Sequence, residues 1–417
     1  MWRKALSILL AGIVIFTGVP VFPSEHLSLD KLIQETREHN PDILAAKKRW
    51  EASLARIPQA KSLDNPNLGL SFEKIPRNTF QIDNTMPADR MLTLSQFFPL
   101  FGKLSLRGKI SLLESQMAAA EYRNKELEII NQVKNAYFDL FMNHQQIELN
   151  QHSLGLLIGI VKVAEARYST GVISQEQVYK INLELAKLNT VILNLKQEQS
   201  AQQTRLNTLL NRNPESPLGI PKLYEDVSFS PDIRSLYQSV LLNQPGLAVF
   251  SYAIERNTYA KSLAKRSFFP DLMSQITLRG ISSGTIGPWD IMLAFSVPLW
   301  FWTKQRYELK EAIANLEEAK SAYEGMKNKV FSEVKDLAIK IEIAKNKIEL
   351  SKTSLMPILE SSIESSLAAF RSGEGDFMAL LNNQRMLIET KMDYYRALVE
   401  YNMNLADLER TIGKELK

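Results

Sequence analysis

The chain repeats its own plan, and this duplication constrains the fold more than any other feature of the sequence. Residues 40–72, "NPDILAAKKRWEASLARIPQAKSLDNPNLGLSF", align with residues 244–276, and both copies contain "AKSL". Residues 92–103, "LTLSQFFPLFGK", correspond to residues 293–304, "LAFSVPLWFWTK", and Gly171 corresponds to Gly373. Such self-similarity predicts two units of one architecture. We therefore predict a first structural repeat at residues 25–210, a proline-rich linker at 211–232 and a second structural repeat at 233–417.

Apolar residues inside each repeat recur with the 3.5-residue period of a coiled coil, which predicts long helices packed as hairpins. In the first copy the predicted helices lie at residues 41–62, 104–170 and 174–210. At 1.5 Å per residue, the longest helix spans roughly 100 Å and its partner only about 55 Å. We therefore expect the helix at 41–62 to stack end to end on the shorter partner. The core positions of the period include Val133, Leu140, Asn143, Asn150, Leu154, Val161, Tyr168, Ile181, Leu185, Leu188, Ile192, Val334, Ile341, Ile348, Leu380, Leu398, Tyr401 and Leu408.

Two stretches in each repeat, between the opening helix and the long helix, alternate apolar and polar residues. This period of two predicts strands with one apolar and one polar face, as in a transmembrane barrel with lipid outside and water inside. Aromatic residues such as Trp300 and Trp302 flank the strands, as they do in such barrels. The predicted lipid-facing residues are Leu68, Leu70, Phe72, Leu92, Leu94, Leu272, Ile276, Leu278, Trp289, Ile291, Leu293 and Phe295.

Four strands are too few to close a barrel, since the smallest known barrels use about eight. If the strands lie in a membrane, the protein must therefore be an oligomer. The alternative is a pair of hairpins packed on the protein's own helices. The fold class predicted from the sequence is thus mainly α with a small β part.

The N-terminus has the pattern of a secretory signal peptide at residues 1–24. Arg3 and Lys4 precede an apolar run that is shorter than the ~20 residues of a membrane-spanning helix. A retained N-terminal anchor is the alternative, because no A-x-A cleavage pattern follows the run. The chain has no cysteine, so it cannot form a disulfide.

Composition and motif spacing argue against several functional classes. The net charge is +4, without any run of five or six like charges, which indicates that nucleic acid is not a partner. The four histidines show no metal-ligand spacing. We also find no nucleotide-binding loop and no catalytic triad, so the sequence predicts no enzyme and no cofactor.

The order of these elements resembles the TolC family of outer-membrane efflux channels over essentially the whole chain after residue 24. The segments that carry the resemblance are "HNPDI" (39–43), "DNPNL" (64–68), "FPLFGK" (98–103), "ARYSTG" (166–171) and "FRSGEGDFMALLNNQR" (370–385). The resemblance implies a homotrimer that pools its strands into one twelve-stranded barrel and continues its helical hairpins as an α-barrel through the periplasm. Residues 98–108, "FPLFGKLSLRG", are similar to the branch that exports heavy-metal cations.

The resemblance also implies partners at the far ends of the hairpins, where glycines permit a tight reversal. These tips are expected to dock a periplasmic membrane-fusion adaptor, which links the channel to an inner-membrane pump. The alternative for any single tip residue is an ordinary helix cap. The tip residues are Arg167, Tyr168, Ser169, Thr170, Gly171, Phe370, Arg371, Ser372, Gly373 and Glu374.

The periplasmic entrance of well-known family members carries two aspartates three residues apart. The matching places here hold Ala379 and Asn382, so the acidic constriction does not transfer. Glu374 and Asp376 are candidates to supply negative charge instead, and a solvated loop is the alternative.

One further correspondence between the two copies predicts a bend. Gly155 falls opposite Pro357, and both residue types weaken a helix. We expect the long helices to bend there, about 22 Å before the tips.

Two functional hypotheses follow from the whole sequence. The first is an outer-membrane channel subunit of a tripartite efflux system, a passive exit duct anchored in outer-membrane lipid. The second is a soluble periplasmic coiled-coil adaptor or scaffold. The alternating strands favour the channel, because an adaptor needs no lipid-facing stripe.

Overall fold

The computed structural model of the chain describes residues 26–73, 89–223, 227–229, 232–280, 287–372 and 377–416. The predicted signal peptide at 1–24 lies outside these residues. Two strands and four helices come first along the chain. They are α1 (Leu29–His39), α2 (Pro41–Lys61), β1 (Asn67–Glu73), β2 (Asp89–Phe98), α3 (Lys103–Ser169) and α4 (Gln175–Leu209). The predicted helix bounds at 41–62, 104–170 and 174–210 are thus confirmed to within one residue.

The same order of elements follows a second time. It comprises α5 (Ile233–Asn243), α6 (Pro245–Arg266), β3 (Asp271–Leu278), β4 (Trp289–Ser296), α7 (Gln305–Leu350), the π-helical turn η1 (Ser351–Leu355), α8 (Met356–Ser372) and α9 (Phe377–Ile412). The short helices α1 and α5 and the turn η1 are not among the predicted elements. No helix within the described residues is long and apolar enough to cross a membrane.

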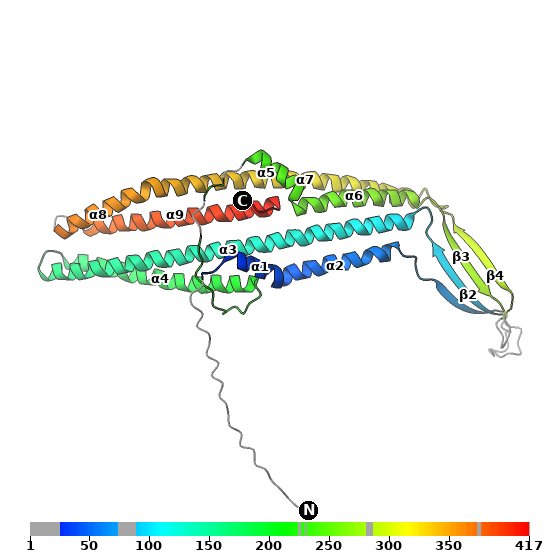
Figure 1. Ribbon diagram of the computed structural model, residues 1–417, viewed down its shortest axis with the longest axis horizontal. Coiled ribbons are helices and arrows are strands. Elements are labelled where there is room, and N and C mark those ends of the chain that lie inside the picture. The colour runs from blue at the N-terminus through cyan, green and yellow to red at the C-terminus, as the bar shows by residue number, and fades with distance from the viewer. Residues whose placement is uncertain are drawn as a thin grey trace, which may run out of the picture.

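The helices form an elongated layer with the sheet at one end (Figure 1). Along one side of α3 lie α4 and α2 in succession, and along its other side lie α9 and α6. The row of α7 and α8 packs on α6 and α9. The predicted end-to-end stacking is confirmed, because Asn40 joins the two shorter helices. Its Oδ1 accepts from the backbone nitrogen of Asp42 at 3.0 Å, while its Nδ2 donates to the carbonyl of Leu209 at 2.8 Å.

The seven-residue period predicted from the sequence is confirmed as the buried seam of the helices. Val133 on α3 and Val334 on α7 are both completely buried, and most of the other core positions are buried or half-buried. Tyr168 is the exception at 45% exposed, because it lies at the hairpin tip, where α3 ends. Apolar side chains gather in clusters near the middle of the molecule and in a separate cluster near the hairpin ends. Burial of this seam is the main force that holds such long helices side by side.

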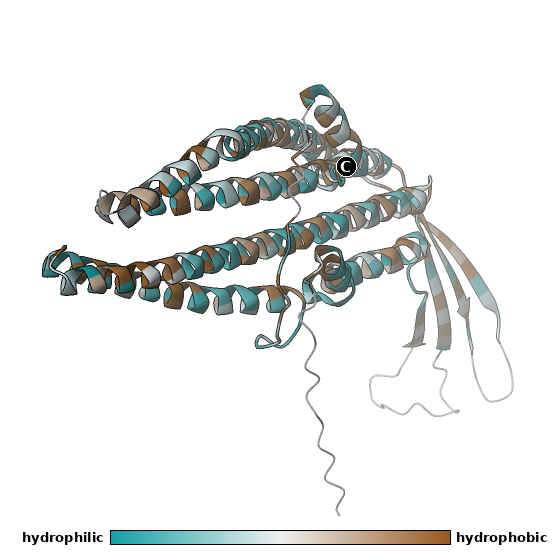
Figure 2. Cartoon of the chain, turned by 60° about the vertical axis from the view of Figure 1, so that its left-hand side comes forward, coloured by the Kyte–Doolittle hydropathy of each residue, from teal (hydrophilic) through white to brown (hydrophobic). Residues whose placement is uncertain are grey.

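The four strands form one antiparallel sheet in the order β1-β2-β3-β4. The pairing of β2 with β3 joins the two halves of the chain, since Leu94 lies opposite Ile276. Figure 2 shows brown and pale bands alternating along the strands, as expected of a sheet whose successive side chains point to opposite faces. The structure thus confirms a mainly α fold with a small sheet.

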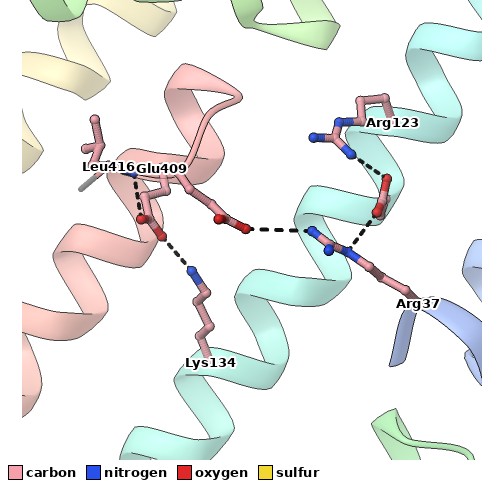
Figure 3. A network of polar contacts seen from close by, with 7 residues as sticks. Arg37, Arg123, Lys134, Glu409 and Leu416 are labelled. Carbon is pink, nitrogen blue, oxygen red and sulfur yellow. Dashed lines mark hydrogen bonds and ion pairs between the residues drawn. The ribbon is translucent and has the colours of Figure 1, made fainter. Parts of the chain in front are cut away.

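A network of charged side chains links α1, α3 and the end of α9 near the middle of the molecule (Figure 3). Arg37 Nε lies 3.0 Å from one oxygen of Glu126, and Arg123 Nη1 lies 2.8 Å from the other. Lys134 Nζ lies 2.6 Å from Glu409 Oε2. Because Lys134 and Glu409 are both largely buried and come from different halves of the chain, this pair fixes how the halves sit against each other.

Candidate functional site

The twelve apolar strand residues predicted to face lipid all lie on one face of the sheet. Residues directly opposite in an antiparallel pair point to the same face, and the register places Leu68 opposite Leu94, Ile276 opposite Ile291 and Leu278 opposite Trp289. Many of these side chains are widely exposed, Leu70 by 71% and Leu293 by 61%. An isolated soluble chain rarely leaves such a continuous apolar surface uncovered.

The opposite face of the sheet is mostly polar. It carries Ser71, Thr93, Gln275, Thr277 and Ser296, and the hydroxyls of Thr93 and Thr277 lie 3.3 Å apart across the β2–β3 pair. Thr277 is buried, and its hydroxyl has polar partners in Thr93 and in the Gln275 amide, 3.3 Å away in each case. The sheet therefore has one apolar and one mostly polar face.

Exposed aromatic side chains gather where β4 leads back to the helices. Trp300 is exposed by 68%, and its ring meets Trp302 edge to face with centroids 5.9 Å apart. Phe301 packs against Trp302 in the same way. Tryptophan in such a position suits a boundary between lipid and water, because its ring is apolar and its N–H is polar.

A buried ion pair fixes the junction between the sheet and the helices. Lys103, the first residue of α3, donates to both carboxylate oxygens of Asp271 at 2.8 Å and to the carbonyl of Phe269 at 2.8 Å. The backbone nitrogen of Leu100 donates to the same carboxylate at 2.9 Å. Lys103 ends the "FPLFGK" segment, yet its spacing gives no sign of the partner, which lies in the other copy.

The first predicted docking tip reverses at Gly171, whose φ of +75° is a left-handed conformation that favours glycine. Arg167 connects this tip with the second one. Its Nη2 donates to the carbonyl of Phe370 at 2.6 Å, and its guanidinium lies over the Phe370 ring, 4.4 Å from the centroid. The structure thus brings two of the predicted tip residues together. Phe370 is also a buried member of the apolar cluster near the hairpin ends.

The remaining tip residues divide into exposed ones and ones outside the described structure. Tyr168, Ser169, Thr170 and Ser372 are exposed, and the serine and threonine side chains among them donate to carbonyls of the preceding turn. The side chain of Arg371 lies outside the described residues. The same holds for three whole residues, Gly373, Glu374 and Asp376.

At the predicted entrance, Ala379 and Asn382 are both exposed on the first turns of α9. One turn further along, Arg385 pairs with Glu184 of α4, which joins the two hairpins near their ends. The hydrogen bond from Arg385 lowers the pKa of Glu184 below its usual value, and a second hydrogen bond from Lys187 acts in the same direction. Among the described residues, no group of three His, Asp or Glu side chains is arranged to hold a metal ion.

The two predicted bend positions differ in their local structure. Gly155 lies inside α3, which continues as α-helix without interruption. Pro357 follows the π-helical turn η1 by two residues. Proline has no N–H and crowds the carbonyl four residues earlier, which disrupts the α-helical bonding just before it.

An extra residue explains why the π-turn occurs in only one copy. Residues 92–103 correspond to residues 293–304, an offset of 201, whereas Gly171 corresponds to Gly373, an offset of 202. The second copy therefore holds one more residue in this stretch. A π-helical turn, with its i→i+5 bonds, accommodates one additional residue within a helix. The seam is then back in register beyond η1.

Comparison with known proteins places this arrangement in a family. The family described as "Outer membrane efflux protein" matches residues 32–212 and 236–414. The cobalt-zinc-cadmium resistance protein CzcC of Cupriavidus metallidurans is 21% identical over 400 residues, which cover 95% of this chain and 93% of CzcC.

Solved structures share the fold. The outer membrane protein VceC of Vibrio cholerae has a TM-score of 0.78 at 17% identity, with 93% of this chain and 97% of VceC covered. CusC, whose crystal structures concern transmembrane channel formation, has a TM-score of 0.79 at 16% identity, with 93% of this chain and 92% of CusC covered. Because the family match extends over both halves of the sequence, from the helices beside the sheet to the hairpin tips, the chain belongs to the outer membrane efflux protein family.

Proposed function

We propose that this outer-membrane efflux protein works as a homotrimeric, passive exit duct that receives its cargo from a periplasmic adaptor and an inner-membrane pump. The observation that carries the proposal is the sheet, which has one exposed apolar face, one polar face and two free edges. The duct itself performs no catalysis, and the energy for transport comes from the pump.

The two free edges of the sheet favour closure by further copies. In the order β1-β2-β3-β4, strands β1 and β4 are the edges, and exposed apolar edges tend to pair with other strands. Four strands fall short of the ~8 that the smallest transmembrane barrels need. Three copies supply the twelve strands that the family resemblance implies.

The helical layer has two free edges as well. One edge is the row of α2 and α4, where Leu183 is 55% and Leu193 is 58% exposed. The other is the row of α7 and α8, where Ile343 and Ile358 are exposed. A head-to-tail contact between two different edges generates a closed ring when the rotation closes. The same ring closes the barrel and the helical tunnel.

A pair of adjacent residues on β1 tests the lipid-facing assignment. We expect Leu70→Arg to prevent stable assembly in the outer membrane, because arginine on a lipid-facing strand costs about 2–4 kcal/mol at the bilayer midplane. Ser71→Arg, one residue along on the polar face, is the matched control and should assemble. Cell fractionation followed by gel electrophoresis without boiling measures the membrane-bound trimer.

Equal assembly of the two arginine variants would count against the lipid-facing assignment. A wild-type chain recovered from the periplasm as a monomer, without detergent, would instead support the soluble adaptor or scaffold hypothesis.

The hairpin tips are the proposed docking surface for the adaptor. This assignment rests on the exposed side chain of Tyr168, the reversal at Gly171 and the Arg167–Phe370 contact that holds the two tips together. Glu374 and Asp376 are the proposed source of negative charge at the entrance, beside Ala379 and Asn382.

The proposed cargo is a heavy-metal cation. Two observations support it: the similarity to CzcC, which extends over 95% of this chain, and the "FPLFGK" segment. The cation is a substrate that passes through the duct, so no resident metal site is required.

Metal resistance provides the readout for the tips and the cargo together. Deleting the gene should sensitise the host to cobalt, zinc or cadmium, and the wild-type chain should restore resistance. Tyr168→Glu should fail to restore it although the trimer still assembles, because a charge replaces an exposed aromatic contact. Leu242→Glu, at a residue 84% exposed on α5, is the control and should restore resistance. Full resistance with Tyr168→Glu would exclude this residue from docking.

We also propose that the helices bend at Gly155 and Pro357 when the duct narrows toward its periplasmic end. The π-turn that precedes Pro357 supports a bend at this residue. Substituting alanine at both positions should straighten the helices and change the conductance of the purified channel in planar bilayers. Unchanged conductance would remove the idea.

A further inference from the structure

The two strand hairpins of the chain have the same register. In the first, Asn67 lies opposite Ser95. In the second, Asp271 lies opposite Ser296. In the sequence repeat, a residue of β1 corresponds to the residue 204 positions later, and a residue of β2 to the residue 201 positions later. Asn67 thus corresponds to Asp271 and Ser95 to Ser296, so the two pairs are equivalent. The hairpins are therefore equivalent units, and whatever joins them inside one chain is a template for what joins them between chains.

The junction inside the chain is the β2–β3 pair. Ser95 lies opposite Gln275 there, and Leu94 lies opposite Ile276. In a ring of copies, this internal junction alternates with a junction between β4 of one copy and β1 of the next. We propose that the junction between copies repeats the β2–β3 register, so that Ser296 lies opposite Ser71 of the neighbouring copy. The inference rests on the trimeric duct proposed above.

The predicted register is consistent with the faces of the sheet. Shifting the internal pair Leu94–Ile276 by the same offsets gives Phe295 opposite Phe72, and both of these side chains lie on the apolar face. Ser296 and Ser71 both lie on the polar face. A slip of one residue would place apolar side chains of one strand beside polar side chains of the other.

The junction between copies lacks the buried ion pair that the junction inside the chain contains. Inside the chain, Lys103 and Asp271 form the buried ion pair, with side chains only 8% and 17% exposed. In the repeat, Lys103 corresponds to Lys304, and Asp271 corresponds to Asn67. Asparagine has the shape of aspartate without its charge. Lys304 and Asn67 are both exposed at the two free edges, and Lys304 makes no ion pair with any part of the chain that the structure describes.

It follows that two kinds of junction alternate around the ring. The junction within each copy is fastened by an ion pair, and the junction between copies brings a lysine against a neutral amide. The β4–β1 junction is therefore the weaker of the two at the level where strands meet helices. A single carboxylate at position 67 would make the junctions alike.

Disulfide formation tests the register, and the absence of native cysteine removes any background. In the full-length chain, Ser71→Cys combined with Ser296→Cys should give covalent dimers and trimers on oxidation, seen on a boiled, non-reducing gel and reversed by reductant. The control combines Asn67→Cys with Ser296→Cys. It displaces one cysteine by four residues, roughly 13 Å along the strand, which is beyond disulfide reach.

The outcomes separate the register from the duct itself. If the assembled trimer cross-links through the control pair and not through the Ser71–Ser296 pair, the register is wrong and the trimeric duct stands. If light scattering finds the detergent-solubilised wild-type chain as a single copy, the proposed function fails and this inference falls with it.

The charge at position 67 is tested separately. Asn67→Asp should raise the temperature at which the detergent-solubilised trimer dissociates, and the gain should vanish in a Lys304→Met background. Ser71→Asp places the same charge four residues further along β1, away from Lys304, and should give no gain. An Asn67→Asp trimer that is no more heat-resistant, or that is equally improved in the Lys304→Met background, would show that the two residues do not meet.

Discussion

Replacing Lys103 with methionine should destabilise the folded chain by about 3–5 kcal/mol, because it leaves a buried carboxylate without its counter-ion. The Lys103 ammonium donates to both oxygens of Asp271 at 2.8 Å in a junction that water scarcely reaches. Methionine has a similar length and fills the space, so the loss reports the charge and not a cavity. Denaturant unfolding of the detergent-solubilised protein measures it.

Two further variants establish the cause of this loss. Lys304→Met changes the exposed counterpart in the second copy and should alter the stability of the single chain by only about 0.5 kcal/mol. Adding Asp271→Asn to Lys103→Met should recover part of the loss, because it removes the unpaired charge. If the double variant loses as much free energy of unfolding as the two single variants together, packing and not charge dominates at this junction.

Gly413→Ala is expected to cost at least about 2 kcal/mol, because two separate penalties act at this position. Its φ of +83° lies in the left-handed region, which an alanine adopts only with strain. A Cβ there would also lie 2.4 Å from the carbonyl oxygen of Asn243 and 2.9 Å from Cδ of Pro245. The end of α9 could then no longer approach the start of α6. Thermal unfolding followed by circular dichroism measures the loss.

Matched substitutions distinguish these two penalties. Gly413→Asn relieves the conformational strain, since asparagine tolerates left-handed backbone, as Asn211 does at φ +58° after α4. It retains the steric clash, so it should remain clearly destabilising. Gly325→Ala, inside α7 with nothing near the added Cβ, should instead stabilise by up to about 1 kcal/mol. Equal stability of the Gly413→Ala variant and the wild type would contradict the close approach of α9 to α6.

The sequence alone determined the features that depend on local periodicity. A seven-residue apolar period forces a helix to bury one stripe, so the seam through Val133, Leu140 and Ile341 could be predicted. A two-residue period assigns the faces of a strand, so the apolar face of the sheet could be predicted as well. The duplication predicted the order of the elements. The register of the sheet brings all twelve predicted apolar residues onto one face because the alternation leaves few other ways to pair the strands.

Only the tertiary structure decided which distant residues meet. Lys103 and Asp271 are 168 residues apart in the chain, and Arg167 and Phe370 are 203 apart. Neither pair has a spacing signature, because the contact depends on how the two halves pack and not on either segment. The repeat offsets of 201 and 202 reveal the extra residue in the sequence, but only the structure shows that a π-turn at Ser351–Leu355 accommodates it. Periodicity is a property of one segment, whereas an ion pair between two segments depends on the fold. The sequence therefore predicted the buried and exposed faces of each helix and strand, and the structure was needed to identify the contacts that hold the two halves together.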